Sequence, residues 1–142
     1  DTLEQPDRVG SANEGVTVIV GNPPYARAPA GSEHHGGWIL DGDPAWRDGR
    51  PPLQDFIDPL KASGGGGHAK NLYNSYVYFW RWALWRAMEA TPGAAVVSLV
   101  TSSSFLAGPA FSGMRQHMRR LADTAWVLDL GQHRALNFLA PT

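Results

Sequence analysis

The chain has 142 residues, 43% of them hydrophobic and 18% charged, with a formal net charge of −1 and no cysteine. This length is typical of a single domain with its own core, and the lack of cysteine excludes disulfides and thiolate metal sites. The balanced charge excludes a module that binds DNA through basic excess alone, because phosphate contacts supply most of such affinity.

No apolar run approaches the length of a membrane span, and the first residues lack the charged-then-apolar pattern of a secretion signal. We therefore expect no membrane partner and a cytoplasmic location, with which the absence of cysteine is compatible. Residues 1–15 are polar and contain glycine and proline breakers, which predicts an irregular connection into the first strand.

Residues 16–20 predict that first strand. The run is short, apolar, mostly β-branched and without alternation, as is typical of a strand buried on both faces in a parallel sheet. Pro23 and Pro24 end it, because neither can donate to a β-ladder. The result is a stiff turn at the carboxyl end of a buried strand, where open α/β sheets bind their ligands.

This turn is rich in hydrogen-bond acceptors. Pro23 and Pro24 have no N–H, Asn22 adds a side-chain oxygen and an amide, and Tyr25 adds an aromatic face. A rigid set of acceptors beside a stacking ring suits a planar, exocyclic amino group. The alternative interpretation is a strand that ends in a proline turn without any chemistry.

Residues 26–70 show little periodicity and many glycines and prolines, which is typical of a functional or disordered loop. Their five basic residues face six acidic ones, so charge alone does not make them a phosphate clamp. Trp38 and Trp46 are expected to anchor the loop on the protein, with base stacking as the alternative. Residues 53–60 predict a short helical turn.

Two motif-like stretches in this segment are rejected. The four glycines at 64–67 follow no strand, and Lys70 is followed by asparagine, so they predict a flexible hinge and not a phosphate loop. His34 and His35 are adjacent and lack partners at ligand spacing, so they do not predict a metal site.

Residues 71–90 predict the strongest helix, which is apolar on nearly all sides. A helix of this kind is expected to pack against neighbours on two sides. One neighbour is the sheet, and the element on the other side need not belong to this chain. Residues 94–100 and 126–130 predict two further strands, with a helix at 110–122 between them. Its basic face is expected to be solvated, with phosphate contact as the alternative; it comprises Arg115, Arg119 and Arg120. This order predicts an α/β fold with right-handed crossovers.

The sequence Asn22-Pro-Pro-Tyr25 after a hydrophobic strand resembles the catalytic motif of the adenine-N6 DNA methyltransferases. The resemblance implies that Asn22 and the carbonyl of Pro23 accept hydrogen bonds from the target N6 amino group. It further implies that Tyr25 stacks on a flipped adenine and that Pro24 stiffens the turn.

The downstream segments resemble those of large single-chain restriction–modification enzymes, most closely the type ISP group, with type IIG and Eco57I-like enzymes next. These segments include Asn71-Leu-Tyr, Gly108-Pro-Ala-Phe and Trp126-Val-Leu-Asp-Leu-Gly131. The implied fold is α/β, the C-terminal part of a Rossmann-like S-adenosylmethionine-dependent methyltransferase fold, with parallel-type strands and crossover helices. Phe138 is the candidate for an aromatic residue that packs on the extruded adenine, although the family's next strand is expected to be absent or cut.

The resemblance also implies an organisation. Residues 1–142 form part of a methyltransferase domain, with a catalytic strand and turn at 16–25, a long loop at 26–70 and a helix–strand–helix–strand unit at 71–131. The main binding motif for S-adenosylmethionine is expected outside this chain. The implied partners are double-stranded DNA and the rest of the parent polypeptide, including a target-recognition domain.

Two other functions remain open from the sequence. Protein glutamine methyltransferases carry a similar Asn-Pro-Pro-Tyr motif and act on a planar amide, although the downstream segments favour DNA. A non-catalytic α/β remnant or interaction module could keep the strand and turn without any transfer activity.

Overall fold

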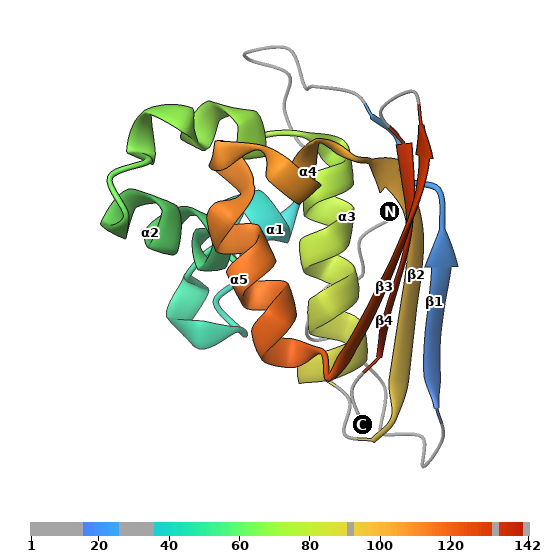
Figure 1. The fold of residues 1–142 in the computed structure, drawn as a ribbon. Coiled ribbons are helices and arrows are strands. Elements are labelled where there is room, and N and C mark those ends of the chain that lie inside the picture. Colours follow the sequence, from blue (N-terminus) through green and yellow to red (C-terminus); the bar gives the residue numbers. More distant parts are fainter. Residues whose placement is uncertain (1–15, 26–35, 91–92, 132–133, 141–142) are drawn as a thin grey trace.

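The computed structural model describes residues 16–25, 36–90, 93–131 and 134–140, and within the last segment the side chains of residues 139 and 140. These residues form two layers, a four-stranded sheet and a group of helices that covers one of its faces (Figure 1). The core lies between the layers and is formed by aliphatic and aromatic side chains from both.

The sheet has the strand order β1-β2-β4-β3. Its strands are β1 (Thr17–Gly21), β2 (Ala95–Ser102), β3 (Thr124–Gly131) and β4 (Arg134–Ala140). β1 runs parallel to β2, as predicted, whereas β4 is antiparallel to both β2 and β3. The expectation that the next strand would be absent or cut was wrong, because β4 lies between β2 and β3 and completes the sheet.

The helices are α1 (Trp38–Asp41), α2 (Gln54–Ala62), α3 (Ser75–Leu84), α4 (Ser104–Ala107) and α5 (Ser112–Leu121). α3 continues into a π-helical turn, Trp85–Glu89, and a 3-10 helix, Gly66–Leu72, leads into it. The predicted helix at 71–90 begins later than expected, because Asn74 is its N-cap and accepts a hydrogen bond from the backbone N–H of Tyr76. The helical turn predicted at 53–60 is confirmed as α2.

Both sides of α3 are covered within this chain. Trp80 and Leu84 are fully buried, and the indole N–H of Trp80 donates to the hydroxyl of Thr101 on β2 at 3.3 Å. On the far side, Trp85 packs edge-to-face on Trp38 of α1, with ring centroids 4.7 Å apart. The second neighbour of the helix is therefore the 38–62 segment with α5 (Figure 1), and the expected anchoring role of Trp38 is confirmed by its burial.

The prediction that the first strand is buried on both faces was wrong for this chain. Ile19 packs against the core, but Val16, Val18 and Val20 are 61%, 60% and 75% exposed. No helix of the described residues lies on that face of the sheet (Figure 1). The unalternating apolar sequence of β1 is therefore that of a two-sided strand, whose outer face is open in this structure.

At Gly113 the backbones of α2 and α5 approach each other closely, and a substitution there tests this packing. A Cβ added to Gly113 would overlap the carbonyl oxygen of Phe56 on α2, so the two helix backbones must separate to accept it. Glycine-to-alanine changes inside helices usually stabilise by about 1 kcal/mol. Here we expect Gly113→Ala to lower the free energy of unfolding by about 1–3 kcal/mol, as overpacking does.

The measurement is urea unfolding of the purified chain beside Gly67→Ala, whose added Cβ meets no atom within 4 Å. Equal stability of the two variants would contradict the close approach of α2 and α5.

Candidate functional site

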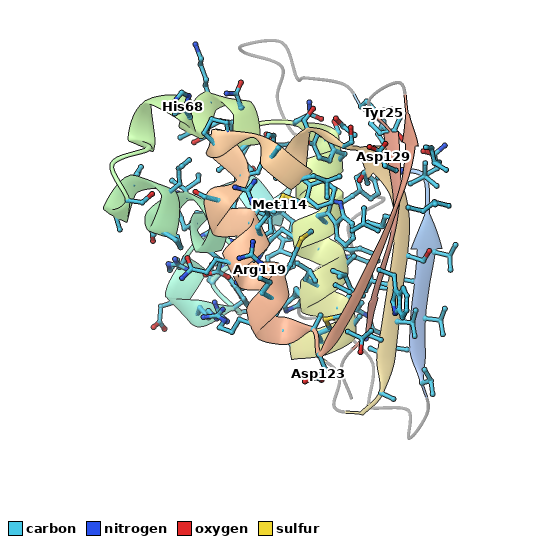
Figure 2. All side chains as sticks on the ribbon, in the orientation of Figure 1. Tyr25, His68, Met114, Arg119, Asp123 and Asp129 are labelled. Atoms are coloured by element: carbon cyan, nitrogen blue, oxygen red, sulfur yellow. The ribbon has the colours of Figure 1, made fainter. Side chains whose placement is uncertain are left out.

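The turn Asn22-Pro-Pro-Tyr25 lies where the sequence predicts it, at the carboxyl end of β1 and beside the end of β2. Pairing of Gly21 with Leu99 aligns the two strand ends, and Figure 2 shows Tyr25 at that end of the sheet. Pro23 is buried and anchors the turn, whereas Asn22, Pro24 and Tyr25 are exposed. The two side chains expected to contact a substrate are therefore accessible, and the residue between them fixes the backbone.

The side chains of Asn22 and Tyr25 contact each other and the neighbouring strand. The hydroxyl of Tyr25 lies 3.0 Å from Oδ1 of Asn22 and 3.0 Å from the carbonyl oxygen of Val100 on β2. A phenolic hydroxyl has one proton, so these two acceptors share a single donor. The hydroxyl can donate to only one of them at a time, so the other acceptor is open to a second donor.

Two cavities flank the turn. A polar pocket of about 310 Å³ is lined by Tyr25, Asn74, Tyr76, Ser102, Ser104 and Phe111, among others. An apolar groove of about 530 Å³ lies along β1, with Asn22 and Pro23 at one end and Phe79 and Trp82 of α3 among its walls. Both volumes are in the range of small-molecule sites, and residues of the turn line both cavities.

The apolar groove offers few polar partners for S-adenosylmethionine, the cofactor that the sequence resemblance implies. Among the described residues that line it, no carboxylate could bind ribose hydroxyls, which is how such folds hold a nucleoside. Among the described residues, no strand is followed by a glycine-rich turn into a helix. The described residues therefore do not form a complete site for this cofactor.

Sequence reasoning missed the residues that β2 brings to the site. Val100, Ser102 and Ser104 reach the turn only because β1 pairs with β2 in this register. A signal was present, since the Thr101-Ser-Ser-Ser104 run is polar and directly follows a buried strand. Polar residues at that place line ligand sites in α/β sheets.

Phe138, the other predicted contact of the substrate, lies in β4. Its backbone pairs with Ser98 and Trp126, within the sheet and away from the end that carries Tyr25. Its side chain lies outside the described residues, as do His34 and His35. A contact between Phe138 and a substrate therefore stays a prediction.

The three arginines of the basic face predicted on α5 differ in their contacts. Arg115 is half-buried and donates to the carbonyl oxygens of Phe105 and Gly108 at 2.7 and 2.9 Å. It therefore holds the end of α4 in place. Arg119 is exposed, as expected for a solvated face. Arg120 is also exposed, but its guanidinium contacts Nδ1 of His117 at 3.0 Å.

A second cluster of titratable groups lies away from this turn and joins three helical segments. Single ligand atoms of Asp55, Glu89 and His117 lie within 4.8 Å of one another, a spacing that could hold a metal ion. However, the fully buried guanidinium of Arg81 contacts Asp55 at 2.7 Å and Glu89 at 2.8 Å. A cation is therefore already present between the carboxylates, and we interpret the cluster as a structural ion-pair network.

The Glu89 carboxylate gives this network a pH dependence. Burial opposes its ionisation, but the hydrogen bond with His117 and the charge of Arg81 outweigh burial and lower its pKa from 4.5 to about 2. A carboxyl whose pKa is lower in the folded than in the unfolded state stabilises the fold above the unfolded value.

We therefore expect the free energy of unfolding to fall as the pH drops from about 4.5 towards 2, by up to about 3 kcal/mol from this group. Urea unfolding of the wild type and Glu89→Gln at pH 7 and pH 3 measures it. The stability difference between the two proteins should narrow at pH 3, and a constant difference would contradict the lowered pKa.

The fold places the chain among α/β proteins, as part of a Rossmann-like domain, which is the class that the sequence predicts. No protein-family model matches the chain, and no curated protein matches it in sequence. In the part of the chain that the structure describes, every helix is too short or too polar to cross a membrane.

A solved structure shares the fold. It is described as "ATP-dependent Type ISP restriction-modification enzyme LlaBIII bound to DNA", with a TM-score of 0.62 and 22% sequence identity. The match covers 89% of this chain and 9% of that enzyme, so the chain spans a small part of its neighbour's length. At this identity the likeness shows the fold.

Proposed function

We propose that this chain forms the base-binding part of an adenine-specific DNA methyltransferase within a restriction–modification enzyme. The complete enzyme transfers a methyl group from S-adenosylmethionine to N6 of an adenine flipped out of duplex DNA. The observation that carries the proposal is the pair of acceptors beside Tyr25 at the end of β1, where Asn22 Oδ1 and the Val100 carbonyl share the single hydroxyl proton of Tyr25. The hydroxyl can donate to only one of the two at a time, so an exocyclic amino group can donate to Oδ1 of Asn22 while the hydroxyl donates to Val100.

In this mechanism the chain holds and orients the amino group. Its two protons are donated to Oδ1 of Asn22 and to the carbonyl of Pro23, while the hydroxyl of Tyr25 turns to Val100. Acceptors on both protons draw the nitrogen lone pair out of conjugation with the ring, so that it points at an incoming electrophile. When bound, S-adenosylmethionine supplies that electrophile as a methyl group on a sulfonium.

The free energy gained from the proposed contacts is comparable with the free energy needed to flip the base. Flipping a base out of the duplex costs a few kcal/mol. Stacking on an aromatic ring returns about 1–3 kcal/mol per base, and Tyr25, 41% exposed, offers such a ring. Hydrogen bonds to the amino group contribute about 1 kcal/mol each. Together these contacts are large enough to offset the cost of extrusion.

The proposed partners follow from what the chain lacks. Its net charge of −1 cannot supply the grip on duplex DNA, and the cofactor requires polar contacts beyond those of the apolar groove. We propose that the rest of a longer polypeptide provides both, through a cofactor-binding half and a target-recognition domain.

A planar amide would also satisfy the acceptors at the turn, so methylation of a protein glutamine is the alternative enzymatic function. The polar pocket favours a nucleotide, because aromatic and hydrogen-bonding groups together line a space of about 310 Å³ beside Tyr25. A remnant without transfer activity is the non-enzymatic alternative.

The test uses the full-length polypeptide, methyl-labelled S-adenosylmethionine and unmethylated genomic DNA. After digestion to nucleosides, the proposal expects the label in N6-methyldeoxyadenosine, at positions that define one recognition sequence. Label on glutamine of an added protein extract would establish the alternative, and no label in either would leave the non-catalytic function.

A further inference from the structure

The polar pocket has a second hydrogen-bonding element on its β2 side, a pair of serine hydroxyls. Oγ of Ser102 and Oγ of Ser104 lie 2.8 Å apart, and the backbone N–H of Ser104 contacts Oγ of Ser102 at 3.3 Å. Ser102 ends β2 and Ser104 begins α4. Strand pairing therefore sets the serine pair beside Tyr25 in the lining of one cavity.

Counting protons shows what this pair can do. Two hydroxyls carry two protons, and the contact between their oxygens uses one of them. Whichever serine donates, the other keeps its own proton for a further acceptor. Oγ of Ser102 also faces the N–H of Ser104, which favours Ser102 as the acceptor within the pair and as the outward donor. The β2 side of the pocket thus offers a donor. The nearest acceptor of the turn is Oδ1 of Asn22, which lies 3.0 Å from the hydroxyl of Tyr25, a residue that lines the same pocket.

A hydrogen-bond donor next to an acceptor complements a base edge on which an amino group lies next to an unprotonated ring nitrogen. In adenine an amino group, which donates, lies next to ring nitrogen N1, which only accepts. Cytosine repeats the pattern with its amino group and N3, whereas guanine and thymine carry a proton on the corresponding ring nitrogen. The aromatic lining supports a flat ligand, because Tyr25 and Tyr76 have centroids 6.5 Å apart, and Tyr76 and Phe111 are 6.2 Å apart.

We propose that the Ser102–Ser104 hydroxyl pair donates a hydrogen bond to the ring nitrogen next to the amino group of the target base, adenine N1. The pair is then a specificity-determining element, which rejects bases that carry a proton at that position. This inference rests on the proposed function, and it adds residues that lie outside the Asn22–Tyr25 turn.

The experiment is a thermodynamic cycle that combines a change in the protein with a change in the substrate. Full-length wild type and the double variant Ser102→Ala/Ser104→Ala each bind and methylate two duplexes, with adenine or 1-deazaadenine at the target position. The analogue keeps the amino group and replaces N1 by C–H. Both serines are changed, because either hydroxyl alone could still donate. The matched control is Ser63→Ala on α2, whose hydroxyl contacts the carbonyl of Leu60.

We expect the wild type and the control to lose about two- to tenfold in affinity and in kcat/KM on the analogue, the effect of one neutral hydrogen bond. On the adenine duplex, the double variant should have an affinity and a kcat/KM lower than those of the wild type by a similar factor. On the analogue duplex, its affinity and kcat/KM should fall no further. Discrimination that survives in the double variant, or a wild type that binds both duplexes equally, would overturn the inference. Because equilibrium binding gives the same cycle without turnover, failure of methyl transfer is distinguishable from failure of this contact.

Discussion

Asn22→Ala in the full-length polypeptide is expected to reduce methyl transfer by about 100- to 1,000-fold, the loss typical when one preorganised hydrogen-bonding group is removed from a reacting centre. The reason is local. Oδ1 of Asn22 is one of two acceptors proposed to hold the amino protons, and alanine leaves only the carbonyl of Pro23. Binding of the cofactor should persist, because the described residues contribute little to it.

The stability of the variant should be unchanged, since Asn22 is exposed on a turn and its truncation leaves no cavity. Initial rates with labelled S-adenosylmethionine measure the effect, with Gln116→Ala, an exposed amide on α5, as the matched control. An Asn22→Ala enzyme within tenfold of the wild type would show that the side chain does not hold the reacting group.

The largest effect on stability is expected at Arg81. Its guanidinium is fully buried and contacts Asp55, Glu89 and, through Nε, the carbonyl of Pro52 at 3.1 Å. Arg81→Met keeps most of the apolar volume but removes the buried cation between the two carboxylates. Their remaining arginine partners, Arg47 and Arg50, are partly exposed to solvent. We expect the free energy of unfolding to fall by about 3–5 kcal/mol, as for other buried pairs that lose one partner.

Denaturant unfolding of the purified chain measures this loss, and Arg119→Met, an exposed arginine on α5, is the control. Adding Asp55→Asn and Glu89→Gln to the Arg81 variant should restore part of the stability, because the two carboxylate charges that lost their buried partner are then removed as well. A loss below about 1 kcal/mol, the size expected of a surface pair, would contradict the role of Arg81 as the centre of the network.

The elements predicted correctly are those whose signals are local. The β-branched run before Gly21, the Pro23-Pro24 stop and the apolar periodicity of α3 each lie within one window of sequence. β4 was missed because one of its two partners, β2, is distant in the sequence, and β4 must insert between β2 and β3. No pattern within Arg134–Ala140 specifies that insertion.

The segment at 26–70, of which the structure describes residues 36–70, was predicted as a loop with one helical turn for a related reason. Its glycines and prolines suppress helical periodicity, yet tertiary contacts impose structure on it. The backbone N–H of Leu53 donates to the carbonyl of Ile39 at 3.0 Å, and Arg81 reaches across from α3 to Pro52. These contacts stabilise α1, which no local pattern predicted, and fix the position of α2.

The same distinction applies to the site. Asn22 and Tyr25 could be predicted because they follow one another in a turn whose chemistry is set by its own residues. The Val100 carbonyl and the serine pair could not, because they reach the turn through the parallel pairing of β1 with β2. The sequence motif therefore predicted the residues of the turn, whereas the residues on β2 and α4 could be found only from the fold.

The measurement that tests the central claim most directly asks whether the turn binds an exocyclic amino group. Full-length wild type and Asn22→Ala are titrated with duplexes that carry adenine or purine, which lacks the amino group, at the mapped target. The account predicts that the wild type binds the adenine duplex about two- to tenfold more tightly, and that Asn22→Ala reduces this preference. An equal preference in both proteins would show that the amino group is recognised elsewhere.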